Sequence, residues 1–152
     1  MKILLAIAAL LAPAAAFAAD PVSLSSEVLV ERVRQEPDGK ATTVLEAPKV
    51  VTPGEKLVFF VNYRNGGAEP ATGFVVTNPI PDAVAFASAE GDAVVSIDGG
   101  KSWGALASLQ VKQADGSSRA ALPGDVTHVR WTFAQAIPAG HAGKVTFRGV
   151  VK

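Results

Sequence analysis

The sequence predicts an all-β protein, with about seven to nine short strands packed as a β-sandwich. Apolar residues recur at period two in three clear runs, Leu57–Tyr63, Val126–Phe133 and Lys144–Val151, as expected for strands with one buried face, although the other face of the first run is mixed rather than fully polar. Turn signals built from Gly, Pro, Asn and Asp separate the runs. No stretch after the N-terminal segment keeps a 3.6-residue periodicity long enough to predict a helix.

The first 18 residues predict a signal peptide rather than part of the fold. Lys2 supplies the positive start, Ile3–Ala12 forms the apolar run, and Ala16-Phe17-Ala18 fits the small-x-small cleavage rule. The apolar run is too short for a membrane anchor, so the mature chain should begin at Ala19 and should not span a membrane. We expect residues 19–152 to form one domain that is exported to the periplasm, the cell surface or the medium.

The composition argues against several classes of protein. The chain has no Cys, so an exported fold would have to be stable without disulfides. Of the 14 basic residues, 13 remain without Lys2, against 14 acidic ones, and opposite charges alternate along the chain. A nucleic-acid groove needs a basic patch, which this pattern does not supply.

Before its central region the chain predicts a polar lead and one hairpin. Asp20–Ser26 is rich in serine and is expected to precede the fold. Val28–Val33 predicts the first strand, and Asp38-Gly39 is a strong turn signal. Thr42–Leu45 then predicts a short strand, which we expect at a sheet edge.

The chain is organised around a strand–turn–strand stretch between residues 51 and 84. Pro53-Gly54 predicts the turn before Leu57–Tyr63, because Pro fixes φ and Gly accepts a positive φ. Asn65-Gly66-Gly67 ends that strand with residues that tolerate a left-handed backbone. Phe74–Thr77 predicts the second strand, and the prolines of Asn78-Pro79-Ile80-Pro81 close it because they cannot sit in a central ladder.

Taken together, these motifs resemble the bacterial secreted and surface "conserved repeat" domain, the eleventh in a series of domains of unknown function. The resemblance lies in the Pro53-Gly54 turn, the alternating strand, the turn from Asn65 to Gly67, and the step from Asn78 to Pro81, where the family more often has Asp first. It implies an immunoglobulin-like β-sandwich, in a family that often forms tandem arrays on large surface proteins. This chain departs from that pattern because it holds a single copy.

A second motif is similar to the Asp-box hairpin, which occurs in sialidase propellers and in several unrelated folds. The residues that carry it are Ser96, Asp98, Gly100, Ser102 and Trp103. An Asp at such a turn accepts backbone N–H groups, Gly supplies a positive φ, and the aromatic ring packs across the hairpin. A single box on a short chain predicts a structural hairpin, not a sialidase.

The rest of the chain predicts short strands and one irregular region. Ala83–Ala89 fits a short strand or a loop, and Ala105–Ala121 fits one strand, Leu109–Lys112, with a mobile loop. The register of the strands decides which side chains face the core. We expect the following to point inward: Leu57, Phe59, Val61, Phe74, Val76, Val129, Trp131, Phe133, Val145 and Phe147.

No pattern in the sequence predicts catalytic residues, a cofactor or a metal ion. His128 and His141 are the only histidines, and a zinc site needs three or four ligands. Loop aspartates could hold calcium and tryptophans could stack on a sugar, but Asp is also a common turn former and Trp commonly packs in a core. These residues are Asp82, Asp92, Asp98, Asp115, Asp125, Trp103 and Trp131.

We therefore expect a non-catalytic interaction or structural module of the cell envelope, whose partner is an envelope protein or a glycan and not a nucleic acid. The alternatives are a glycan- or calcium-dependent binding module and a small hydrolase. Binding should use either an exposed sheet edge, with Thr42–Leu45 as the candidate, or loops at one end of the sandwich. The candidate loops, which we favour over the edge, are Asp82–Ala93 and Ala105–Pro123.

Overall fold

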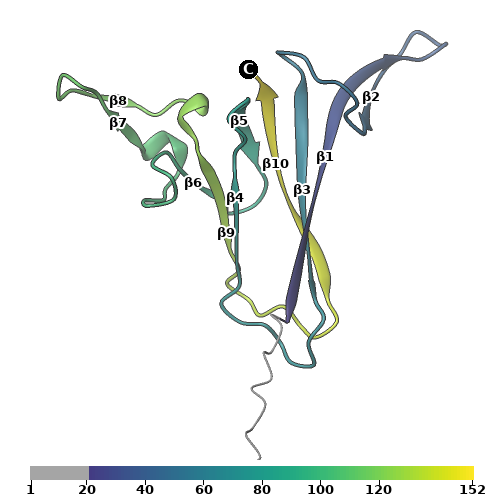
Figure 1. Ribbon diagram of the computed structural model, residues 1–152. Helices are drawn as coiled ribbons and strands as arrows, with labels where there is room; N and C mark the ends of the chain where they lie inside the picture. Colours follow the sequence, from purple (N-terminus) through teal and green to yellow (C-terminus); the bar gives the residue numbers. More distant parts are fainter. Residues whose placement is uncertain (1–20) are drawn as a thin grey trace, which may run out of the picture.

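The computed structural model describes residues 21–152, so the expected signal peptide and its cleavage site lie outside the described residues. The described residues form ten strands and two short 3-10 helices. Eight strands build two antiparallel sheets that pack as a β-sandwich, as the alternating pattern predicts (Figure 1). The immunoglobulin-like assignment stays a prediction. Neither helical segment of residues 21–152 has the length and apolar character needed to cross a membrane.

The larger sheet has five strands in the order β2-β1-β3-β10-β5. The last strand of the chain, β10, therefore lies inside the sheet, between β3 and β5. The bounds are β1 (Val22–Gln35), β2 (Ala41–Glu46), β3 (Lys56–Asn65), β5 (Val84–Ala89) and β10 (Ala142–Val151).

The smaller sheet has three strands in the order β4-β9-β6: β4 (Val75–Pro79), β9 (His128–Thr132) and β6 (Val94–Ser96). Because β4 is an edge strand, its last residue can be a proline without breaking a central ladder. A separate hairpin pairs β7 (Gln110–Lys112) with β8 (Ser118–Ala120). Figure 1 shows this hairpin and the β1–β2 hairpin projecting at the end of the sandwich that also holds the C-terminus.

Two predictions about the extent of strands are wrong. Val22–Ser26 is not a polar lead but part of β1, which pairs with β3 from Val22 to Glu31. Ala105–Ala121 holds two strands instead of one strand and a loop, because the chain turns back at Gly116, where φ is 85°. The ambiguous stretch from residue 83 to residue 89 contains a strand, β5.

The predicted turn before β3 is present. Pro53 and Gly54 occupy its two central positions, and Glu55 N donates to Thr52 O at 3.1 Å to close it. Gly54 has a φ of 92°, which a side chain would disfavour. A second bond, from Gly54 N to Val151 O at 2.8 Å, ties this turn to the end of β10.

The turn after β3 is held by a buried side chain and not by a left-handed backbone. The strand ends at Asn65 as predicted, but none of Asn65, Gly66 and Gly67 has a positive φ. Asn65 is fully buried, and its Nδ2 donates to Glu69 O and to Ile137 O, both at 2.8 Å, while its Oδ1 accepts from Gly67 N at 2.9 Å. The amide thus joins the end of β3 to the loop that precedes β10.

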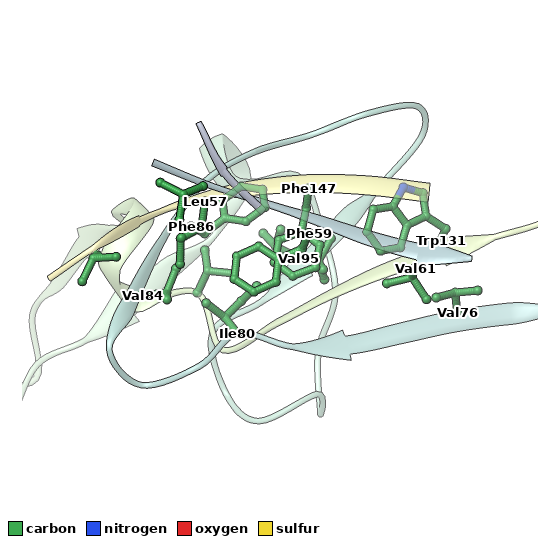
Figure 2. Packing of buried hydrophobic residues seen from close by; sticks show 14 residues of the cluster. Leu57, Phe59, Val61, Val76, Ile80, Val84, Phe86, Val95, Trp131 and Phe147 are labelled. Atoms are coloured by element: carbon green, nitrogen blue, oxygen red, sulfur yellow. The ribbon is translucent and has the colours of Figure 1, made fainter. Parts of the chain in front are cut away.

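The core lies between the two sheets, and the predicted inward face is confirmed. Phe59 and Phe147 stack with ring centroids 4.4 Å apart, and Figure 2 shows them among the surrounding aliphatic side chains. Trp131 is also buried, and its Nε1 donates to Glu90 O at 2.8 Å. Of the ten residues expected to point inward, three are only partly buried but pack against the same cluster: Phe74, Phe133 and Val145.

The outer face of the five-stranded sheet is closed near the middle of β3. Val58 points away from the core side chains of β3, yet it is only 1% exposed. It lies opposite Arg148 in the ladder, and Arg148 Nη1 is 3.1 Å from Glu90 Oε1. Long charged side chains of this kind cover apolar surface with their aliphatic stems. Towards the end of β3 the outer face is hollowed, because the short side chains of Ser23 and Ser25 lie opposite the strand there.

Candidate functional site

The Asp98 hairpin is a closed turn whose polar atoms bind one another. Asp98 Oδ1 accepts from the backbone N–H groups of Lys101 at 3.0 Å and Ser102 at 2.9 Å, and Oδ2 accepts from the Ser102 hydroxyl at 2.6 Å. These hydrogen bonds, led by the one from the Ser102 side chain, hold the pKa of Asp98 well below its usual range. The carboxylate is therefore engaged as an acceptor within its own turn.

The other residues of this motif complete the same turn. The buried Ser96 hydroxyl donates to Asp98 Oδ1 at 2.7 Å and accepts from Gly100 N at 2.8 Å. Gly100 has a φ of 87°, and its carbonyl accepts from Trp103 Nε1 at 3.0 Å. The Arg130 guanidinium carbon lies 3.7 Å from the centroid of the Trp103 ring, so this face of the ring is covered and is not open to a sugar.

The predicted turn residues do not meet at one place. Pro53 and Gly54 precede β3, whereas Asn65 is its last residue and Gly67 follows it, so the two pairs lie at opposite ends of that strand. The remaining two flank the end of β4. Asn78 Nδ2 donates to Pro79 O at 2.8 Å, and Pro81 O accepts from Val84 N at 2.8 Å.

The loop aspartates of residues 21–152 are not gathered into one cluster. Residues 21–152 contain no group of three or more His, Cys, Asp or Glu side chains that could hold a metal ion. Asp115 Oδ1 accepts from Ser117 N at 2.9 Å within its own turn. Asp125 accepts two hydrogen bonds from Arg119, each 2.7 Å long, and Arg119 is the main cause that lowers the pKa of Asp125 to about 2. Asp115 thus binds within the tip of the β7–β8 hairpin, and the contact between Arg119 and Asp125 holds its base.

His128 lies in a hollow of about 350 Å³ at one end of the sandwich. Asp82 lines the same hollow, and His128 Nδ1 is 3.1 Å from Thr127 Oγ1. Gly99 and Pro81 also line it, which places the Asp98 hairpin beside the turn after β4. The hollow brings the imidazole and a carboxylate into one region without a serine in its lining.

β1 has an unpaired edge over more than half of its length. β3 pairs with β1 from Val22 to Glu31, whereas β2, on the other side, pairs only from Val30 to Gln35. Within residues 21–152, no strand lies beside Val22–Leu29 on the β2 side. This segment of β1, Val22–Leu29, is called the free edge below.

The direction of the main-chain groups identifies which of them are unpaired. Pro21 O accepts from Gly66 N at 2.7 Å, so the main-chain groups of odd-numbered residues point towards β3. Main-chain groups of successive strand residues point to opposite sides of the strand. The N–H and C=O groups of Val22, Leu24, Ser26 and Val28 therefore point to the side that has no neighbouring strand.

Within residues 21–152, the free edge lacks most of the features that usually protect edges. Proteins guard them with lysines, prolines, bulges or a covering segment, but this segment holds one charged residue, Glu27. Leu24 is 52% exposed, and an apolar groove of about 540 Å³ lies beside it, lined by Pro21, Val22 and residues 70–75. The edge at β2, which was the edge candidate from the sequence beside the favoured loops, carries instead an ion pair of 2.6 Å between Arg34 and Glu46.

A basic hollow of about 560 Å³ lies on the outer face of the same part of β1. Ser23 is opposite Arg64, and Ser25 is opposite Asn62, which in turn is opposite Lys144 of β10. The two cations line the hollow together with these short side chains. Among residues 21–152, no carboxylate lies within 4.0 Å of the charged nitrogens of Arg64 or Lys144.

The free edge and the basic hollow were missed from the sequence, although a signal for the strand is present. Val22, Leu24, Ser26 and Val28 continue the period-two pattern of β1 towards its start. Three serines in this stretch gave it the composition of a polar lead. The pairing of β2 with only the second half of β1 depends on tertiary structure, so no local sequence pattern predicts it.

Comparisons with known proteins do not identify a relative: no family model, no curated protein and no solved structure matches this chain. The resemblance to the bacterial "conserved repeat" domain therefore stays a prediction. What can be inferred about function rests on the geometry described above.

Proposed function

We propose that this protein is an exported, non-catalytic interaction or structural module of the cell envelope that binds by strand pairing at its free edge. The observation that carries the proposal is the row of unpaired main-chain groups from Val22 to Val28. A partner segment in an extended conformation would pair with these groups as an additional strand.

Two features beside the free edge support binding there. Main-chain hydrogen bonds supply affinity in strand addition, and pockets for alternate side chains supply specificity. The groove lined by Pro21, Val22 and residues 70–75 offers an apolar surface on the inner side of the edge. Leu24, exposed at this groove, would be covered by an added strand.

The proposal of export rests on the N-terminal sequence. Lys2, the apolar run Ile3–Ala12 and the small-x-small site Ala16-Phe17-Ala18 are the three parts of a secretory signal. We propose that the mature chain begins at Ala19. Intact-mass measurement of protein from the periplasm or medium tests this, and a retained Met1 would point to an anchored protein instead.

Capture experiments with defined variants test the binding site. Ser26→Pro removes an N–H group that points to the free side and leaves the ladder with β3 intact. We expect tagged wild-type protein to capture a partner from envelope extract, which can be a second copy of this chain, and Ser26→Pro to lose it. A control variant in which residues 112–118 become a short Gly-Ser turn should still capture the partner, because the β7–β8 tip is remote from the edge.

Both variants must match the wild type in circular dichroism and in their urea midpoints for the comparison to count. If Ser26→Pro captured the partner as well as the wild type does, the free edge would not be the binding site. Loss of capture in the hairpin control alone would move the site to the loops. Turnover of an ester or glycoside panel by the purified protein would place it among enzymes.

A further inference from the structure

We propose that the strand accepted by the free edge is the free edge of a second copy of this chain, which gives a dimer with one continuous sheet across the two subunits. The inference rests on the proposed function, since it names the partner of the same site. It follows from the pairing rules of antiparallel strands and from the position of one carboxylate relative to one cation.

The direction of the main-chain groups limits the possible registers. Residues 22, 24, 26 and 28 point to the free side, so in a two-fold antiparallel pair they must face one another. The central register places Leu24 opposite Ser26 of the partner subunit and Val22 opposite Val28 of the partner subunit. It uses every unpaired group from Val22 to Val28, and a C2 arrangement repeats each contact twice.

In this register the charges on the outer face are complementary. Glu27 of one subunit lies opposite Ser23 of the partner subunit, and Ser23 is itself opposite Arg64 in the ladder with β3. The Cα atoms of Glu27 and the partner's Arg64 are then about 10 Å apart, across one hydrogen-bonded and one non-hydrogen-bonded pair. Two long side chains can span this distance over a serine.

Both charged groups are available for this contact. Glu27 and Arg64 are exposed, and neither takes part in an ion pair with another residue of the described chain. Arg64 lines the basic hollow, whose other cation is Lys144 and whose lining contains no carboxylate. The Glu27 carboxylate of the partner subunit would supply the missing negative charge at its margin.

The inner face of the pair is apolar except for Ser26. Val28 of the partner subunit falls opposite Val22, beside the groove formed with residues 70–75, and Leu24 loses exposed surface. One strand pair is a small interface, below about 1,200 Å² in total. We therefore expect a dimer that dissociates at about micromolar concentration.

Sedimentation of the mature chain and of two charge-reversal variants tests the inference. Wild-type protein should show a concentration-dependent monomer–dimer equilibrium. Glu27→Arg and Arg64→Glu should each raise the dimer Kd by about tenfold or more, because each replaces two attractive contacts with two like-charge ones.

An equimolar mixture of the two variants should dimerise again. In the mixed dimer, the arginine introduced into one subunit faces the glutamate introduced into the other, so the first contact is attractive with its charges exchanged. The second contact joins the unchanged Glu27 of one subunit to the unchanged Arg64 of the other. Like charges therefore meet at neither contact, and the Kd should return towards the wild-type value.

Amide hydrogen exchange supplies a second, register-specific readout. Raising the protein concentration should protect the amides of Leu24, Ser26 and Val28. The amides of Ser23 and Ser25 already point towards β3, so their protection should not depend on concentration. Ser26→Pro, which lacks one of the required N–H groups, should remain a monomer.

A wild-type chain that stays monomeric far above micromolar concentration would overturn the inference, as would a dimer that neither charge variant weakens. The proposed function fails separately, when Ser26→Pro captures the envelope partner as well as the wild type does. A monomer that captures a different protein through the edge keeps the function and rejects the second copy. A monomer that binds polygalacturonate through Arg64 assigns the basic hollow to an acidic glycan, which also rejects the second copy.

Discussion

The ring of Phe59 on β3 lies flat against the ring of Phe147 on β10, with 4.4 Å between the centroids and 3° between the planes. The two residues are directly opposite in the ladder, so one contact joins the central strand of the larger sheet, β3, to the last strand, β10. Phe147 is fully buried and Phe59 is 7% exposed. The rings can stack in this way only when β3 and β10 pair in this register, so the pair links the strand register to the core packing.

Removing the Phe59 ring should destabilise the fold strongly. We expect Phe59→Ala to lower the free energy of unfolding by about 3–5 kcal/mol, through lost burial and the cavity left against Phe147. Phe60→Ala is the matched control: Phe60 is on the outer face, partly exposed, with Lys144 Nζ 4.6 Å from its ring centroid, and should cost clearly less. Equal losses in urea melts would show that the register is wrong by one residue.

The Asn65 side chain should matter more than its place in a turn suggests. Asn65→Ala would remove the donor to Glu69 O and Ile137 O and would leave the N–H of Gly67 without its acceptor, at a cost of about 2–3 kcal/mol. Asn78→Ala loses a single bond to a neighbouring carbonyl and should cost less than about 1 kcal/mol. Urea midpoints measure both. A loss at position 65 no larger than that at position 78 would remove Asn65 as the link between β3 and the loop before β10.

Asp98 should act through acceptance of hydrogen bonds and not through proton transfer. Asp98→Ala removes the acceptor for Lys101 N and Ser102 N, so its urea midpoint should fall. The urea midpoint of Asp98→Asn should fall less, because an amide oxygen still accepts these hydrogen bonds. The structural role is rejected if the Asn variant keeps full stability and loses a measurable ligand or activity.

Acid should weaken the fold through the same kind of contact. Arg119 lowers the folded-state pKa of Asp125 to about 2, whereas the unfolded value is about 3.9. The stabilisation by this carboxylate is therefore present above about pH 4 and is lost as the pH falls towards 2. Asp98, whose pKa is also lowered, acts in the same direction.

Urea midpoints measured between about pH 5 and pH 2 should fall with pH in the wild type. The Asp125→Asn variant should start lower at neutral pH and should show a flatter dependence, since it lacks one of the titrating groups. Parallel curves for the two proteins would show that the contact between Arg119 and Asp125 does not contribute to stability.

The fold class and the inward face could be predicted because they depend on a local pattern. Leu57, Phe59 and Val61 occupy every second position of one strand, so the pleat places their side chains on one face. The closing turn at Asn65 could not be read correctly, because its cause is a side chain bonded to Ile137, far away in the sequence. Asn can end a strand through a left-handed backbone or through hydrogen bonds of its side chain, and the sequence does not show which of the two is used.

The candidate site was hidden for a related reason. Strand pairing decides whether an edge is free, and the length of β2 relative to β1 emerges only when the hairpin is assembled. The basic hollow likewise combines Ser23, Arg64 and Lys144 from three strands. Charges that alternate along the sequence can still gather on one face of a sheet, since residues opposite one another come from distant segments.

The position of β10 between β3 and β5 also constrains how the chain folds. Until the last ten-residue strand is available, β5 has no neighbour in the larger sheet and Phe59 has no stacking partner. Pairing β10 with β3 closes a loop that runs from residue 65 to residue 141, about half of the chain, and such non-local contacts make folding slow. The larger sheet therefore cannot be completed before residues 142–151 have been synthesised, and until then only β2, β1 and β3 can pair within it.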